Sequence, residues 1–277
     1  MIRGSTALIA HLGFPTFTFK SPMIYNPYFE QAGIDAVVVP MACRSEHYAN
    51  FLRALFTLDN IRGALITMPH KVATVALLDE TSPSVRISGA CNAVRRDADG
   101  RLVGDMFDGE GFVRGMRRNG ARPEGARALV IGCGGVGSAI AASLAGAGVA
   151  AISLFDADPS AANALAGRIA AHYPDLALQS GNKDPAGHTV VVNATPLGMN
   201  VGDAMPMDVT RIDANAFVGE VVLKTEMTTF LQAVQARGCR FQVGSDMLFE
   251  QIPAYLEFFE FQSTTAEHLR AVARLDY

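Results

Sequence analysis

Short runs of apolar, β-branched residues alternate with helix-like stretches along nearly the whole chain. In the first part, the candidate strands are ALIAH (7–11), AVVVP (36–40) and GALIT (63–67), with helix-like stretches near Pro22 to Gln31 and Glu46 to Phe56. A second series of strands contains ALVIG (128–132), AISLFD (151–156), TVVVNAT (189–195) and FVGEVVL (217–223). This alternation is typical of parallel sheets with helical crossovers, so the pattern predicts an α/β fold.

The alternation is interrupted at two places. Pro123 and Gly125 stand just before the second series and mark a candidate junction between two units. The pattern does not assign the helix predicted from Gly109 to Asn119 to one unit or the other. After FQVG (241–244), the strands stop and two helical stretches with bulky apolar residues on one face follow. The pattern alone does not predict where these last helices pack.

Composition narrows the class of protein. The 277 residues are 49% hydrophobic and 18% charged, which supports a substantial core, and the net charge of −4 offers no basic stripe for nucleic acid. The four cysteines are scattered without a C-x-x-C pair, which argues against a zinc site or a disulfide framework and fits a reducing compartment. The first residues lack the long apolar run of a signal peptide, and the apolar region 139–155 parses as a helix and a strand. We therefore expect a soluble, cytoplasmic protein.

The loop GCGGVG that follows ALVI is the most specific motif in the chain. Gly132 permits a tight turn, Gly134 lets the backbone approach a pyrophosphate, and Gly137 allows the next helix to pack closely on the strand. The amides at the start of that helix, from Gly135 and Val136 onward, attract phosphate groups. The strand before the loop and the Ala-rich helix after it support a dinucleotide-binding site over a simple turn.

An acid ends the next strand, as the dinucleotide fold requires. Asp156 stands where a carboxylate binds the ribose hydroxyls of adenosine and repels a 2′-phosphate. The stretch from Ala157 to Ala162 contains no arginine or lysine that would bind such a phosphate. The sequence therefore favours NAD over NADP, whereas Asp158, before Pro159, reads as an N-cap or turn residue.

Six segments in the same order resemble the shikimate/quinate dehydrogenase family. They are GFPTFTFKSP (13–22), LITMPHK (65–71), SGACNAV (88–94), GDMFDGEGF (104–112), VNATPLGM (192–199) and VGSDMLFEQ (243–251). Each motif is modest alone, but together they cover nearly the whole chain. The resemblance implies an N-terminal α/β substrate domain (1–107 plus 245–277), to which the C-terminal helices return, and a Rossmann domain (108–244).

The resemblance also implies roles for individual residues. Lys71 would be the proton-transfer group and Asp108 its partner, while Thr67, Asn92 and Gln251 would hold ring hydroxyls. The family has a pair of serines that contact the substrate, and this chain would retain only the second of them, Ser21. The cofactor-binding set would comprise Gly132, Gly134, Gly135, Val136, Asp156, Thr195, Val221 and Gly244.

Each of these residues also has an ordinary structural interpretation. A lysine that begins a helix is usually solvated, Asp-Gly is usually a turn or a cap, and a lone Asn or Gln closes a turn or lies on a packed helix. His11, His47 and His70 lack a carboxylate at a suitable spacing, so we expect them to be structural or exposed. The joint match of the motifs favours function for the others.

Two departures from the family pattern fall at the same end of the expected substrate. Phe19 stands at the family's first serine, with Thr18 at the preceding histidine, and Leu223 stands where the family has a tyrosine. In the family, that serine and tyrosine contact the substrate's carboxylate. We therefore expect shifted or relaxed specificity, with shikimate a poor substrate unless Thr16, Thr18 or Lys20 supplies the missing contacts.

These observations lead to one main hypothesis and two rivals. The main hypothesis is a nicotinamide-dependent oxidoreductase acting on a ring hydroxyl of shikimate, quinate or a related cyclic hydroxy acid, as a monomer or homodimer without metal, membrane or nucleic acid. A strict NADP-linked shikimate dehydrogenase is the alternative within the enzyme class. A non-catalytic dinucleotide or metabolite sensor is the alternative outside it.

Overall fold

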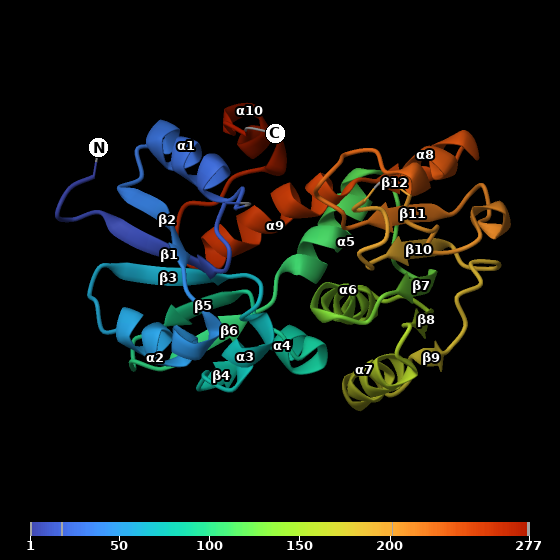
Figure 1. Ribbon diagram of the computed structural model, residues 1–277, viewed down its shortest axis with the longest axis horizontal. Helices are drawn as coiled ribbons and strands as arrows, with labels where there is room; N and C mark the ends of the chain where they lie inside the picture. The colour runs from blue at the N-terminus through green and yellow to red at the C-terminus, as the bar shows by residue number, and fades with distance from the viewer. Residues whose placement is uncertain (1, 18, 201, 276–277) are drawn as a thin grey trace. The chain divides into compact units, whose positions relative to one another are not determined.

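The computed structural model describes residues 2–17, 19–200 and 202–275 and divides the chain into two compact units (Figure 1). Unit 1 comprises Met1–Val85, Gly89–Met106 and Ile252–Tyr277, and unit 2 comprises Arg86–Ser88 and Phe107–Gln251. Each unit is built on one six-stranded sheet covered by helices, which confirms the predicted α/β fold.

The sheet of unit 1 mixes parallel and antiparallel strands in the order β2-β1-β3-β5-β6-β4. Its strands are β1 (Ala7–Gly13), β2 (Ala36–Ala42), β3 (Ile61–Ile66), β4 (Glu80–Thr81), β5 (Ala93–Arg96) and β6 (Leu102–Asp105). The three predicted strands, β1 to β3, pair in parallel, whereas β5 runs antiparallel to both β3 and β6. The antiparallel pair was not predicted from the sequence.

Helices cover this sheet and end where the sequence signals suggest. They are α1 (Pro22–Ala32), α2 (Ser45–Leu55), α3 (Lys71–Val75), the start of α4 (Pro83–Ser88), the end of α9 (Gly244–Phe258) and α10 (Ala266–Val272). Helix α1 begins with Pro22 in its first turn, and Gly33 closes it with a φ of 67°, a left-handed conformation that glycine adopts without strain. Figure 1 draws α1 and α10 together on one side of unit 1 and α2 on the other.

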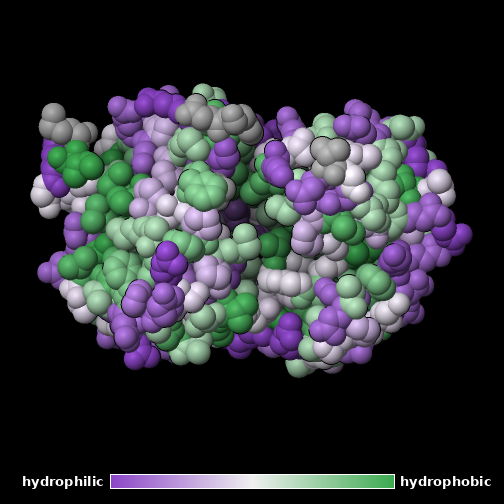
Figure 2. Space-filling view, viewed as in Figure 1, coloured by the Kyte–Doolittle hydropathy of each residue, from purple (hydrophilic) through white to green (hydrophobic). Residues whose placement is uncertain are grey.

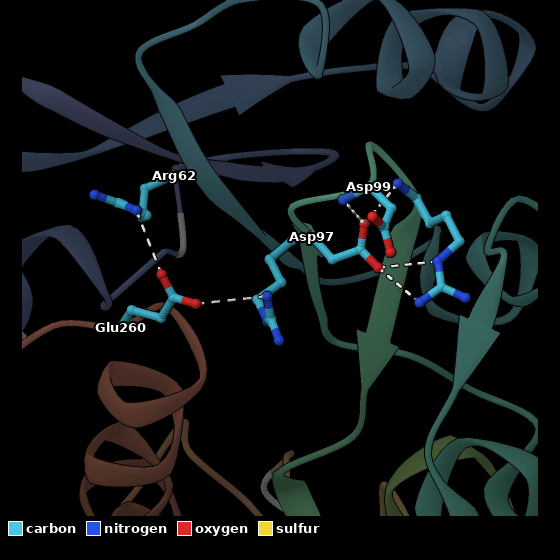
Figure 3. A network of polar contacts seen from close by, with 6 residues as sticks. Arg62, Asp97, Asp99 and Glu260 are labelled. Carbon is cyan, nitrogen blue, oxygen red and sulfur yellow. Dashed lines mark hydrogen bonds and ion pairs between the residues drawn. The ribbon is translucent and has the colours of Figure 1, made fainter.

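The C-terminal segment is anchored within unit 1 by packing and by charge. A Cβ on Gly63 of β3 would collide with the Phe259 ring, so the missing side chain lets Phe259 lie directly on the strand. Glu260 then bridges two arginines, with its carboxylate oxygens 3.5 Å from Arg62 and 3.7 Å from Arg95 (Figure 3). Exposed ion pairs of this kind contribute about 0–1 kcal/mol each, so the buried ring is the stronger anchor.

The sheet of unit 2 is parallel throughout, in the order β12-β11-β10-β7-β8-β9. Its strands are β7 (Arg127–Ile131), β8 (Ala151–Phe155), β9 (Ala177–Ser180), β10 (Val190–Asn193), β11 (Phe217–Glu220) and β12 (Arg240–Gln242). Its helices are α5 (Asp108–Arg118), α6 (Gly135–Gly146), α7 (Pro159–His172), α8 (Thr229–Ala236) and the short 3₁₀ helix η1 (Val209–Arg211), with most of α9. Counted from β7, this is the strand order 3-2-1-4-5-6 of a Rossmann fold.

Alternate residues of the central strands fill separate cores on the two faces of this sheet. Ala128 and Val130 of β7 pack with α5, α6 and α7, whereas Leu129 and Ile131 pack with α8 and η1. A strand buried on both faces must be apolar at every position, which explains the continuous run ALVI.

Among the described residues, no helix is both long and apolar enough to cross a membrane. On the face drawn in Figure 2, hydrophobic and hydrophilic residues are interspersed.

Candidate functional site

The glycine loop of unit 2 has the open geometry that a pyrophosphate requires. Gly132 has a φ of 97°, and a Cβ there would lie 2.7 Å from the carbonyl of Ala194. A Cβ on Gly137 would collide with the carbonyl oxygen of Gly132, so this glycine brings α6 against the loop. Around Gly134, the cap of α6, nothing lies within 4 Å of an added Cβ. The residues present therefore fit a dinucleotide phosphate above the first amides of α6, those of Gly135 and Val136.

Asp156 follows β8 as predicted, but both of its carboxylate oxygens already accept hydrogen bonds. The backbone amide of Cys133 donates to Oδ2 at 2.7 Å, and the amide of Asp158 donates to Oδ1 at 2.9 Å. Asp156 therefore fastens the end of β8 to the glycine loop after β7. Asp158 is the N-cap of α7 and accepts from the Ser160 amide, as its interpretation as a cap predicts.

A lysine distant in sequence lies near the end of β8. Strand β9 pairs with β8, and the Gly181 amide donates to the Leu154 carbonyl at 3.0 Å, so the loop after β9 begins beside the end of β8. Lys183, two residues farther along, places its Nζ 5.7 Å from the centroid of the Phe155 ring. The residues directly after Asp156 do not reveal this cation, because the pairing of β9 with β8 brings it there from a distant part of the sequence.

A buried polar network joins the ends of β10 and β11. Glu220 is fully buried, and its carboxylate accepts from Asn193 Nδ2 at 2.8 Å and from the Thr228 hydroxyl. Burial raises the pKa of Glu220 above its usual range, although the hydrogen bonds from Thr228 and Asn193 oppose that rise. Asn193 in turn accepts from both the amide and the hydroxyl of Thr195, a predicted cofactor-binding residue.

The sequence contained a signal for this network that was not used. A glutamate within the apolar run FVGEVVL is buried if the run is a central strand, and buried carboxyl groups require partners. Two other predicted cofactor residues, Val221 and Gly244, meet just after β11, because a Cβ on Gly244 would lie against the backbone of Val221 and Val222.

In unit 1, Lys71 begins α3 at a corner that is held from several sides. Thr67 follows β3, its amide donates to the Leu12 carbonyl at 2.9 Å, and its carbonyl accepts from the His70 amide at 2.9 Å. His70 is buried, its Nε2 lies 2.8 Å from the Cys43 carbonyl oxygen, and its ring stacks on Tyr48 with centroids 3.9 Å apart. This confirms a structural role for His70 and leaves Lys71, which is only half-buried, at the first position after a rigid turn.

Backbone bonds bring Asn92 beside the same corner. Its carbonyl accepts from the Ile66 amide at 2.8 Å, and the amide of its neighbour Cys91 donates to the Lys71 carbonyl at 2.9 Å. Asn92 is buried, with 1% of its surface exposed. Unit 1 thus gathers Thr67, Lys71 and Asn92 at the carboxyl end of β3.

Asp108 and Gln251 lie in unit 2, on two helices in close contact. Asp108 is the first residue of α5 and is 4% exposed. A Cβ on Gly111 of the same helix would lie 2.7 Å from Gln251 Cβ on α9. The Oε1 atom of Gln251 is buried and finds no hydrogen-bond partner among the described residues, as expected of a group that holds a ligand. The pairing of Asp108 with Lys71 stays a prediction, because the two residues belong to different units.

Phe19, one of the two departures from the family pattern, packs against an uncharged histidine in unit 1. The Phe19 ring stacks on the buried His11 ring with centroids 4.0 Å apart, and its tip lies over Gly13 beside the Thr67 methyl group. Burial, and then the charge of Lys71, lower the pKa of His11 to about 3, so this imidazole is neutral at physiological pH.

The other residues expected near the substrate's carboxylate differ in how exposed they are and in which unit they lie. Ser21, Thr16 and Lys20 are half-buried, and Thr18 lies outside the described residues. In unit 2, the side chain of Leu223 is 45% exposed.

Comparisons with known proteins agree over nearly the whole chain. The family model for the shikimate dehydrogenase substrate binding domain matches residues 12–94, and the model of the ThiF family matches residues 120–165. A shikimate dehydrogenase (NADP(+)) from Acidiphilium cryptum is 33% identical over 276 residues, which are 99% of this chain and 98% of the relative.

Two solved structures superimpose closely. Shikimate 5-dehydrogenase from Listeria monocytogenes, in complex with shikimate and NAD, gives a TM-score of 0.91 at 26% identity and covers 98% of this chain and 97% of its own. The 5-ketofructose reductase of Gluconobacter sp. strain CHM43 gives 0.88 at 25% identity and covers 96% of this chain and 97% of its own.

These comparisons correct the cofactor prediction. Curated relatives that match at least nine-tenths of the chain carry NADP(+) in their names, so the inference of NAD from Asp156 was wrong. In the loop, each oxygen of the Asp156 carboxylate accepts a backbone amide, and these hydrogen bonds partly offset its charge toward a phosphate. A cation from a neighbouring strand also lies outside the stretch from which NAD was inferred.

Proposed function

The chain belongs to the shikimate dehydrogenase family, and from that premise we propose that it is an NADP-dependent oxidoreductase acting on a ring hydroxyl of a cyclic hydroxy acid related to shikimate or quinate. The observation that carries this proposal is the 33% identity to a shikimate dehydrogenase over 99% of the chain. We further propose that the enzyme works in the cytoplasm as a monomer or homodimer.

The glycine loop and the first turn of α6 would hold the pyrophosphate, and Thr195, Val221 and Gly244 would line the path toward the nicotinamide. When bound, the nicotinamide supplies or accepts the hydride. The chain's own contribution is then to orient the substrate and to move one proton at the oxygen that is oxidised or reduced.

Lys71 is the residue proposed for that proton. It begins α3 directly after a corner fixed by His70, so its backbone position does not depend on the substrate. In the reducing direction its ammonium donates a proton to the carbonyl oxygen, and in the oxidising direction the amine accepts one. Asp108 would hold the ammonium in place, while Thr67, Asn92 and Gln251 would bind the remaining hydroxyls.

The substrate's carboxylate would meet an unusual surface in this member of the family. Phe19 and Leu223 supply no hydrogen bond to an acid, and the His11 behind Phe19 carries no charge. We therefore propose that shikimate itself binds weakly. The structurally similar 5-ketofructose reductase, named for an uncharged keto sugar, supports including such substrates in the test.

Turnover of a panel of cyclic hydroxy acids and keto sugars with NADPH, in wild type and Lys71→Ala, tests the function. We expect Lys71→Ala to lower kcat by about 10²- to 10⁴-fold, the usual contribution of a general acid or base, with an unchanged Kd for NADPH. Lys224→Ala is the control, since it removes an exposed lysine of unit 2. Near wild-type turnover by Lys71→Ala would refute the assigned role, and tight NADPH binding without turnover of any substrate would favour the sensor.

A further inference from the structure

The loop after β9 presents a cation at the adenosine end of the dinucleotide fold. In this fold the ribose of adenosine lies beyond the carboxyl end of the second strand, here β8. Lys183 reaches that end from the neighbouring strand, with its Nζ 5.7 Å from the centroid of the Phe155 ring. Phe155 is the last residue of β8 and directly precedes Asp156.

Local hydrogen bonds give this loop a defined shape. Asn182 Oδ1 accepts from the Asp184 amide at 3.0 Å, and Asp184 Oδ1 accepts from the Ala186 amide at 3.1 Å, which makes two consecutive turns around Lys183. Just before them, the Ser180 hydroxyl donates to Asn163 Oδ1 of α7 at 2.6 Å. The loop is therefore fastened to the same helix that follows Asp156.

The charge of Lys183 is not neutralised by its acidic neighbour. Asp184 forms two hydrogen bonds with the guanidinium of Arg211, at 2.8 and 2.6 Å, and this pairing lowers the pKa of Asp184 to about 2. No described carboxylate forms an ion pair with Lys183, whose side chain is exposed. Among the described residues, its ammonium contacts an aromatic ring face, a weak interaction that leaves its N–H donors available.

We propose that Lys183 binds the 2′-phosphate of NADP and so offsets the repulsion from Asp156. This assignment rests on the proposed function, in which NADP is the cofactor. Asp156 then has a structural role, since its two oxygens connect the glycine loop to the start of α7, while the phosphate is bound by the loop after β9. A 2′-phosphate carries about −1.5 to −2 charges, so one lysine neutralises only part of it.

Isothermal titration calorimetry with 2′,5′-ADP and 5′-AMP tests this assignment without any turnover, since the two nucleotides differ only by the 2′-phosphate. We expect wild type to bind 2′,5′-ADP more tightly, and Lys183→Ala to weaken that binding about tenfold, the lower limit for one charge-assisted hydrogen bond. Binding of 5′-AMP should not change. Lys183→Arg should retain most of the preference, and Lys183→Glu should abolish it.

Arg127→Ala is the matched control, because it removes one exposed positive charge at the start of β7, the opposite end of the same sheet. It should leave both nucleotides unaffected. If wild type prefers 2′,5′-ADP and Lys183→Ala keeps the full preference, or weakens both nucleotides equally, the assignment of Lys183 is wrong and NADP remains the cofactor. If wild type does not distinguish the two nucleotides, the choice of NADP fails and this assignment fails with it.

Discussion

Substitution of Glu220 tests how much the buried polar network next to the predicted cofactor site contributes to stability. Its buried carboxyl group connects Asn193 to Thr228, and Asn193 in turn holds Thr195. Glu220→Gln keeps the shape and one acceptor while removing the charge. Glu220→Ala removes the acceptor shared by Asn193 Nδ2 and the Thr228 hydroxyl, so one N–H and one O–H are left buried without an acceptor.

The pH dependence of stability follows from the direction of the pKa shift. Burial raises the pKa of Glu220 in the folded protein above its value in the unfolded chain, so the folded state binds this proton more tightly. The contribution to the free energy of unfolding is complete below the unfolded pKa of about 4.3 and is lost as the pH rises through the folded pKa. Each unit of upward shift corresponds to about 1.4 kcal/mol.

Urea unfolding of wild type and Glu220→Gln from pH 4 to pH 8 measures this contribution directly. The wild type should lose stability relative to the variant as the pH rises, while groups common to both proteins, such as the neutral His11, cancel in the difference. Glu220→Ala should lose about 2–6 kcal/mol, from two unpaired groups at about 1–3 kcal/mol each, and should weaken NADPH binding. Parallel pH profiles for wild type and Glu220→Gln would refute the argument that burial dominates.

Two further substitutions test the loop and the substrate pocket. Gly137→Ala should abolish detectable NADPH binding in calorimetry, because its Cβ would collide with the Gly132 carbonyl. The control Gly167→Ala, in open space on α7, should leave binding intact and stabilise the fold by about 1 kcal/mol. Equal effects of the two substitutions on binding would contradict the close approach of α6 to the loop. Phe19→Ser should raise kcat/KM for shikimate about tenfold or more by restoring a hydrogen bond to the substrate's carboxylate. The control Phe17→Ser, at an 85% exposed ring, should not change it. An unchanged kcat/KM in Phe19→Ser would show that another group binds the carboxylate.

The sequence predicted those parts of the fold whose signals are local and periodic. The runs 128–132 and 217–223 became β7 and β11, because a strand buried on both faces has to be apolar throughout, and the run 36–40 became the edge strand β2. The pair of β5 and β6 was missed, since each strand has only four residues and includes arginine or aspartate. Strands this short depend on tertiary contacts that no local pattern records.

Predictions of the candidate site succeeded and failed for a related reason. The glycine loop was recognisable because its turn, its phosphate amides and its helix are consecutive in sequence. The prediction of NAD was wrong because it rested on Asp156 as a free carboxylate and on the lack of a cation among the six residues after it. Hydrogen bonding of that carboxylate and the position of Lys183 are both determined by strand pairing.

Strand pairing also explains where the candidate residues of each unit collect. In parallel strands, the carboxyl ends meet at one edge of the sheet, where successive loops leave the strands with backbone groups unpaired. In unit 1, Thr67 and Lys71 follow β3 beside the end of β1, and in unit 2 the glycine loop, Asp156 and Thr195 follow β7, β8 and β10. A charged residue directly after a buried parallel strand therefore has a better claim to function than the same residue elsewhere on the surface. Lys183 lies in the loop at the carboxyl end of the exposed edge strand β9, and strand pairing with β8 brings it to this edge of the sheet, although no family motif includes it.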